Sequence, residues 1–315
     1  MRLFSDAKYA FLGSRRRAYV VSIALILVGA VGLLLRGGFD AGVEFTGGTM
    51  VQVRFSQATD VAGVRAALNS AGFTGERIQP LTGPGADASN PEFLIRVPTL
   101  DGAGLEGVRD QMDAALASTY GEGGFEIRSA DGIAPSVGSE LRNKAAMALG
   151  LSFLLTLIYL AFRFEWRFGF AAIIATIHDM LITFGFIALL NIEISLATVA
   201  AILTIIGYSL NDTIVVFDRV RENFKKKRKE TYQATLDRSI NETLPRTVLT
   251  SGTTFAALLS LFILGGPVIR PFALVLMLGV LIGTYSSIFV ASPALYEIEE
   301  RARRRNAQQA ARAAG

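Results

Sequence analysis

Four ionisable side chains stand in or at the start of apolar stretches of this sequence. Asp212 lies in IIGYSLNDTIVVF, His178 and Asp179 lie together in AIIATIHDMLITF, and Arg246 stands near the start of LPRTVLTSGTTF. An acidic side chain at membrane depth costs roughly 3 kcal/mol, so such groups usually face a protein interior or water and mark ion or proton paths. These residues are therefore the candidates for chemistry, and that chemistry is proton transfer.

Asp212 is the strongest of these candidates. Burial favours the neutral carboxylic acid and a nearby cation favours the carboxylate, so the group can take up or release a proton as its surroundings change. We expect Arg246, entering the membrane from the same side, to pair with Asp212 in one state and to release it in another. The residues alone equally allow a static ion pair.

His178 is the single histidine of the chain. A histidine can relay protons near neutral pH, but a lone histidine on a helix is as readily a hydrogen-bonded structural residue. Neighbouring side chains on a helix point about 100° apart, so His178 and Asp179 cannot both face one neighbour. We expect one of the two side chains to have a packing role and the other to have a functional role.

Several other kinds of chemistry are not indicated. The chain has no cysteine, which excludes disulfides and Cys-based zinc or redox sites. It carries no phosphate loop, nucleophile elbow or zinc-ligand spacing, so we expect no enzyme activity, metal or cofactor. The glycine-rich segment 42–48 precedes a predicted strand and lacks the helix N-terminus of a phosphate site. The basic residues are clustered rather than spread over a face, so no nucleic-acid partner is expected.

The elements that position the candidates are six apolar runs. Of the 315 residues, 51% are hydrophobic and 18% charged, a composition that favours a membrane protein. A hydrocarbon core is about 30 Å thick, and we expect it to be crossed at 18–36, 144–163, 169–190, 194–218, 246–265 and 270–296. The first run is longer than the apolar part of a signal peptide and has no small-residue cleavage site after it, so we interpret it as an uncleaved anchor.

A soluble domain is predicted between the first two runs, at 37–143. Its alternating and helical patterns follow the order βαββαβ, which is typical of a ferredoxin-like α+β domain. Small residues are frequent in the last two apolar runs, and we interpret them as sites of close helix packing.

Basic residues predict the orientation. They gather in the segment 1–17, in the loop 219–245 and in the tail 297–315, and are nearly absent from the alternate loops. The positive-inside rule then places both termini in the cytoplasm and 37–143 on the periplasmic side. The run Lys225 to Lys229 is a topology signal lying against anionic lipid, or else a docking surface for a cytoplasmic partner.

At these residues the sequence resembles SecF-type members of the SecD/SecF family of protein-export membrane proteins. The resemblance covers nearly the whole chain and is carried by IGYSLNDTIVVFDRVREN at 206–223, LPRT at 244–247 and the segment 269–293. The segment GVEFTGG at 42–48 and the His178-Asp179 pair also look like family positions. The family usually has aspartate where this chain has Glu44.

The resemblance implies a fold and a function. It implies six helices in half of a bundle like that of the resistance-nodulation-division (RND) transporters, in a complex with SecD in the bacterial inner membrane. It further implies assistance, driven by proton motive force, to late preprotein translocation through SecYEG after SecA has acted. Asp212 looks like the family's proton-pathway aspartate and Arg246 like its arginine partner. Two alternatives remain at this point, a subunit of a proton-coupled small-molecule exporter and a passive translocon scaffold.

Overall fold

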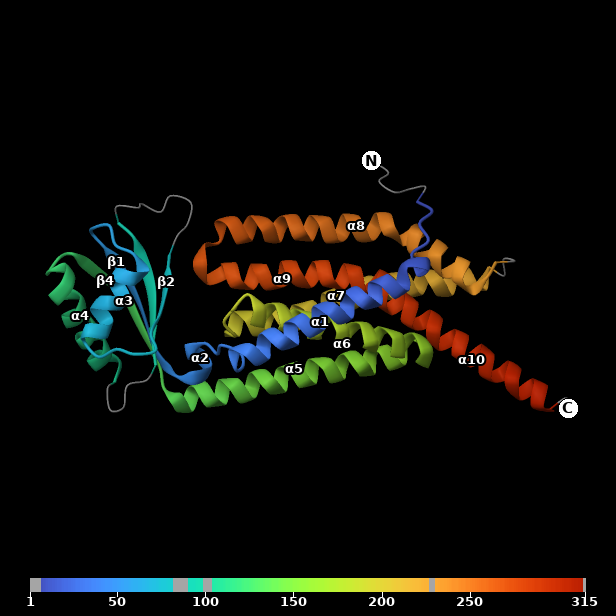
Figure 1. Ribbon diagram of the computed structural model, residues 1–315, viewed down its shortest axis with the longest axis horizontal. Helices are drawn as coiled ribbons and strands as arrows, with labels where there is room; N and C mark the ends of the chain where they lie inside the picture. The colour runs from blue at the N-terminus through green and yellow to red at the C-terminus, as the bar shows by residue number, and fades with distance from the viewer. Residues whose placement is uncertain (1–6, 82–89, 99–103, 227–229, 314–315) are drawn as a thin grey trace.

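The helices of this chain form a bundle that carries a sheet-containing domain at one end. The computed structural model describes residues 7–81, 90–98, 104–226 and 230–313. Within these residues six helices are long and apolar enough to cross a membrane. The start of the first helix and the end of the last lie away from the sheet domain (Figure 1). The chain is a multi-pass membrane protein with an inserted α+β domain, which confirms the predicted fold class.

Most of the membrane helices are longer than the apolar runs that predict them. They are α1 (Arg15–Arg36), α5 (Pro135–Arg163), α6 (Trp166–Leu189), α7 (Leu196–Lys225), α8 (Tyr232–Leu264) and α9 (Gly266–Ser286). A short 3-10 turn, η1 (Leu12–Ser14), precedes α1, and α9 continues through a π-helical turn, η2 (Ser287–Ala291), into α10 (Ser292–Ala313). Backbone hydrogen bonds extend a helix past its apolar part, so α5 begins well before residue 144 and α10 runs through most of the tail.

The six helices form an inner and an outer group. In α6 and α7, 56% of the most apolar window is buried, and in the last span 67% is buried. The corresponding share is 11% or less in α1, α5 and α8, which leave large apolar side chains uncovered. A helix that is apolar on its uncovered side suits lipid or another membrane subunit.

One close contact shows how α1 joins the inner group. A Cβ added to Gly29 of α1 would lie 2.5 Å from the Cα of Gly185 in α6. Two glycines therefore let these helices touch backbone to backbone, as small residues commonly do in membranes.

The inserted domain has the predicted βαββαβ order. Its elements are β1 (Gly48–Phe55), α3 (Val61–Ser70), β2 (Arg77–Pro80), β3 (Glu92–Val97), α4 (Leu105–Tyr120) and β4 (Phe125–Ile133). The strands are antiparallel in the order β2-β3-β1-β4, the ferredoxin-like arrangement. Alternate residues of the strands and one face of each helix form a separate apolar core. Asp60 caps α3 by accepting a 2.8 Å hydrogen bond from the Gly63 N–H.

The glycine-rich segment 42–48 forms the joint between membrane and domain. It folds as the short helix α2 (Val43–Thr46), followed by Gly47 and Gly48 at φ angles of 77° and 144°. A Cβ on Gly47 would lie 2.8 Å from the Cα of Pro135, where α5 begins. Glycine is therefore required for this turn by both its backbone angle and its neighbour.

The basic run predicted at Lys225 to Lys229 lies partly outside the described residues. Lys225 is the last residue of α7, and residues 227–229 lie outside the described residues.

Candidate functional site

Asp212 is buried where α7, α8 and α9 meet. Only 3% of the residue is exposed. Its Oδ2 accepts a hydrogen bond of 3.2 Å from the Ser251 hydroxyl of α8, and the Thr284 hydroxyl of α9 lies 3.4 Å away. Thr284 also lies 2.7 Å from Ser251 Oγ, so the two hydroxyls form a short chain that ends on the carboxylate. Hydroxyls from two helices thus hold a group that α7 carries.

Arg246 is not bonded to Asp212 in this arrangement. Its side chain is exposed near the start of the membrane part of α8, and among the described residues no ion pair joins it to Asp212. The predicted partner therefore lies on a neighbouring helix without an ion pair to Asp212, and the exchange between a paired and a released state stays a prediction.

Asp179 and His178 form a second buried network on α6. Asp179 is fully buried and its Oδ1 lies 2.8 Å from His178 Nδ1. Its Oδ2 accepts hydrogen bonds from Ser209 of α7 and, at 2.7 Å, from Ser286 of α9. His178 turns the other way, with its Nε2 2.9 Å from the Ser22 hydroxyl of α1. The two neighbours face different helices, as predicted, but both take part in one network rather than one of them only packing.

The histidine end of this network continues to an aromatic hydroxyl. Ser22 Oγ lies 3.3 Å from the Tyr285 hydroxyl, which donates at 2.9 Å to the carbonyl of Ala18. Hydroxyl and imidazole groups can each pass a proton while reorienting. The series from Tyr285 through Ser22 and His178 to Asp179 is therefore chemically able to relay protons.

The two networks share the contact between α7 and α9. Ser209 and Asp212 are three residues apart on α7 and so lie on the same side of that helix. A Cβ on Gly283 of α9 would lie 2.9 Å from the Cβ of Ser209, so only glycine permits this approach. Directly after Ser286, α9 passes into the π-helical turn η2, a feature that is frequent at functional sites.

Both carboxylates of this site are buried in the bundle and are held by hydroxyl groups. Within the described part of the chain, no ion pair joins either carboxylate to a lysine or arginine, and Arg246 acts on Asp212 only through its charge at longer range. A buried carboxylate without a cation is costly, and neutralisation by a proton removes that cost. The described residues contain no group of three or more His, Cys, Asp or Glu side chains that could hold a metal ion.

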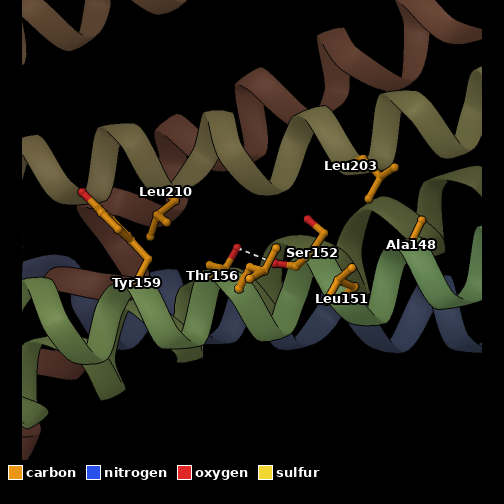
Figure 2. Close-up of a pocket in the computed structure, with 8 residues that line it drawn as sticks. Ala148, Leu151, Ser152, Thr156, Tyr159, Leu203 and Leu210 are labelled. Carbon is orange, nitrogen blue, oxygen red and sulfur yellow. Dashed lines mark hydrogen bonds between the residues drawn. The ribbon is translucent and has the colours of Figure 1, made fainter.

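A wide groove between α5 and α7 lies outside these networks. Ser152, Thr156 and Tyr159 of α5 and Leu203 and Leu210 of α7 line it, and the Thr156 hydroxyl donates within its own helix, to the carbonyl of Ser152 (Figure 2). It contains no acidic or basic side chain. The groove shows that α5 packs loosely on the bundle, and it offers an apolar surface rather than a proton site.

The sequence does not identify the hydroxyls that hold the carboxylates as site residues. Ser251, Thr284 and Ser286 fall among the small residues that the sequence predicts as packing positions. The signal that identifies them is the position of their hydroxyl groups on the buried sides of α8 and α9, which the sequence alone does not show. A hydroxyl in the core of a membrane bundle needs a partner, and here the partner is a carboxylate.

Comparisons with known proteins agree on the family. Residues 112–301 match the family model "Protein export membrane protein SecD/SecF, C-terminal", and residues 35–59 match "SecD/SecF GG Motif". The protein translocase subunit SecF of Gemmatimonas aurantiaca is 49% identical over 96% of this chain and 90% of its own length. SecF of Vibrio alginolyticus is 39% identical over 92% of this chain and 90% of its own length.

A solved structure gives the same answer. The crystal structure of SecDF from Thermus thermophilus, described as a translocon-associated membrane protein, superposes with a TM-score of 0.81 at 38% identity. The match covers 95% of this chain and 40% of the SecDF chain. The SecDF sequence from that organism is 40% identical over 98% of this chain and 40% of its own length. From these matches and from its fold, this chain belongs to the SecD/SecF family of protein-export membrane proteins.

Proposed function

We propose that this protein is an accessory subunit of the Sec protein translocase that couples proton movement to late steps of preprotein translocation. The observation that carries the proposal is the pair of buried carboxylates, Asp179 and Asp212, each held by hydroxyls from neighbouring helices rather than by a fixed cation. Its relatives are named as translocase subunits, and we assign it no catalytic reaction.

The proposed partner in the membrane is SecD. In the Thermus thermophilus relative one chain named SecDF includes a part matching this chain, which supports association of the two halves. The uncovered apolar faces of α1, α5 and α8 offer surface for that association and for lipid. We further propose that the complex acts at the SecYEG channel, after SecA, on an unfolded preprotein.

The proposed location is the bacterial inner membrane, with both termini in the cytoplasm. The clustering of basic residues before α1, between α7 and α8 and after α9 supports this orientation. Residues 37–143 then lie on the periplasmic side, where a preprotein emerges. The soluble domain carries the opposite charge character, with acidic residues in excess.

In the proposed mechanism a proton changes the packing of α7 against α8 and α9. Protonation neutralises Asp212, which weakens its hydrogen bonds to Ser251 and Thr284 and its attraction to Arg246. The glycine contact of α9 with α7 permits two close arrangements, and the outer domain follows the helices as a rigid body. The two arrangements must differ in proton affinity, because a ligand that binds both equally shifts nothing.

The energy required is compatible with a proton gradient. Reversing a two-state equilibrium from 1:99 to 99:1 takes about 5.5 kcal/mol. One elementary charge crossing 100 mV supplies about 2.3 kcal/mol. More than one proton per cycle is therefore expected, which fits a second acidic site in SecD or the second carboxylate, Asp179, in this chain.

The test is export of a secreted preprotein in cells whose only copy carries Asp212→Asn. We expect export to fall to the level of cells lacking the protein, while membrane abundance and association with SecD stay normal. The matched control is Asp218→Asn on the same helix, an exposed carboxylate paired with Arg163, which should export normally. Normal export by Asp212→Asn would favour the passive scaffold, and loss of small-molecule resistance without an export defect would favour the exporter.

A further inference from the structure

Five charged side chains meet where the sheet domain joins the helix bundle, and none of them belongs to the buried networks. They come from five separate segments of the chain. They are Asp40 after α1, Glu44 in α2, Arg77 in β2, Arg96 in β3 and Glu193 between α6 and α7.

The two arginines require acidic partners outside the sheet. Arg77 and Arg96 stand directly opposite each other in the register of β2 and β3. Like charges in that relation destabilise a sheet. Arg77 forms an ion pair with Asp40, and Arg96 forms one with Glu193. The Arg96 and Glu193 side chains are only 17% and 14% exposed, so this second pair is largely withdrawn from water.

The backbone holds the acidic partners side by side. Ile194 donates to the carbonyl of Asp40 at 2.7 Å and accepts from the Gly42 N–H at 2.8 Å, forming a parallel bridge between the two segments. A Cβ on Gly42 would lie 2.3 Å from Glu44 Oε2 and 2.8 Å from Glu193 Oε1. Gly42 therefore makes room for two carboxylates. Glu44 Oε2 is buried and has no hydrogen-bond partner among the described residues.

The acidic side of this cluster is fixed to the helices that carry the proton site. Glu193 lies in the short connection between α6, which carries Asp179, and α7, which carries Asp212. The Glu193 carbonyl accepts a 2.8 Å hydrogen bond from Thr198 in the first turn of α7. Ser195 caps the same helix by accepting from the Thr198 N–H. A displacement of α6 and α7 therefore moves Glu193 with it.

The covalent connections of the domain run elsewhere. The chain enters the domain from α1 and leaves it into α5, and neither helix carries one of the buried carboxylates. Both helices belong to the outer group, and α5 packs loosely. Contact between the domain and the α6–α7 connection is therefore a route from the carboxylates to the sheet that does not pass along α1 or α5.

We infer that the cluster of Asp40, Glu44, Arg77, Arg96 and Glu193 is the mechanical joint through which α6 and α7 move the outer domain. Arg96 and Glu193 act as positioning residues that transmit a displacement and do not themselves carry protons across the membrane. This inference rests on the proposed function, because it assigns the path between the proton site and the part that meets the preprotein.

The first test is charge exchange. Arg96→Glu and Glu193→Arg, each alone, should lower preprotein export about fivefold or more with normal abundance and SecD association. The double variant, with the two charges exchanged, should recover most of that loss. The matched control is Arg128→Ala, which removes an exposed ion pair with Glu126 inside the domain and should leave export unchanged.

The second test replaces the ion pair by a covalent link. The chain has no cysteine, so Arg96→Cys with Glu193→Cys introduces the single reactive pair. A thiol-cleavable bifunctional reagent of about the length of the two lost side chains, applied from outside the cell, should restore export that the unlinked variant lacks, and reductant should abolish it again. A merely structural role for the charges predicts no recovery on linking.

The outcomes separate this inference from the proposed function. If the single variants and the unlinked cysteine pair export normally while Asp212→Asn does not support export, the inference about the joint is contradicted and the proposed proton coupling stands. If Asp212→Asn itself exports normally, the proposed function fails first. Loss in both single variants without recovery on exchange or linking would also overturn the joint.

Discussion

Replacing Gly283 with alanine tests whether the contact of α9 with α7 holds the buried networks in place. The added Cβ would lie 2.9 Å from the Cβ and 3.0 Å from the Cα of Ser209. Carbon atoms are best separated by about 3.5–4.0 Å, so α9 must retreat by roughly 0.6 Å or more. Ser209 and Ser286 donate to Asp179 from the two sides of this contact.

The cost follows from the packing and from the hydrogen bonds. Overpacking a tight contact costs about 1–3 kcal/mol. The Ser286 bond to Asp179 is 2.7 Å long, and a retreat of roughly 0.6 Å takes it beyond the usual hydroxyl range of about 2.5–3.0 Å. A hydrogen bond to a charged group contributes about 1.5–3 kcal/mol. We therefore expect Gly283→Ala to lose about 2.5–6 kcal/mol of stability and to slow export.

The assay compares two glycine variants by thermal unfolding in detergent and by export in cells. Gly207→Ala is the matched control, because Gly207 lies on α7 close to Ser209 and its added Cβ would meet nothing within 4 Å. The control should be as stable as the native chain or more so, since alanine is favoured over glycine in a helix by about 1 kcal/mol. A Gly283→Ala protein as stable and as active as Gly207→Ala would refute the reasoning.

Two further predictions concern the outer domain. Burial raises the pKa of Glu193, Arg96 and Arg77 lower it in part, and Glu44 and Asp40 raise it further. Glu193 therefore binds its proton more tightly when the sheet domain contacts the α6–α7 connection than when it does not. This contact should be strongest below the ordinary glutamate pKa and should weaken as the pH rises through the raised pKa of Glu193. Amide hydrogen exchange at Ile194, corrected for the intrinsic exchange rate, should show this pH dependence, and Glu193→Gln should abolish it. Asp60→Ala removes the cap of α3 and should cost about 1 kcal/mol of domain stability without changing the membrane networks, as thermal unfolding and export would report.

The sequence predicts the fold of this protein well, because both of its parts have strong local patterns. Each membrane helix contains a long and predominantly apolar run, and β1 alternates between buried and less buried residues. The helix ends are less visible, because hydropathy marks the part of a helix that suits lipid and not its hydrogen bonding. At the start of α5, Glu140 and Lys144 form an ion pair one turn apart and continue the helix beyond the apolar run.

Only part of the candidate site can be predicted from the sequence. Asp179 and Asp212 stand out as charges in apolar runs, but Ser251 and Thr284 resemble packing residues until their neighbours are known. The cluster that forms the proposed joint is still harder to predict from the sequence, because Arg96 and Glu193 are 97 positions apart and each alone resembles an ordinary surface charge. Pairing across such separations depends on tertiary structure, which no local pattern encodes.

The central claim is that a proton on Asp212 drives the translocation step, and its most direct test is a proton gradient applied to the reconstituted complex. The chain, SecD and the translocon are placed in liposomes with a preprotein arrested late in translocation, and completion is followed with and without the gradient. We predict that the gradient accelerates completion with the native chain and has no effect with Asp212→Asn, while Asp218→Asn behaves as the native chain. Equal acceleration with native and Asp212→Asn proteins would contradict the account.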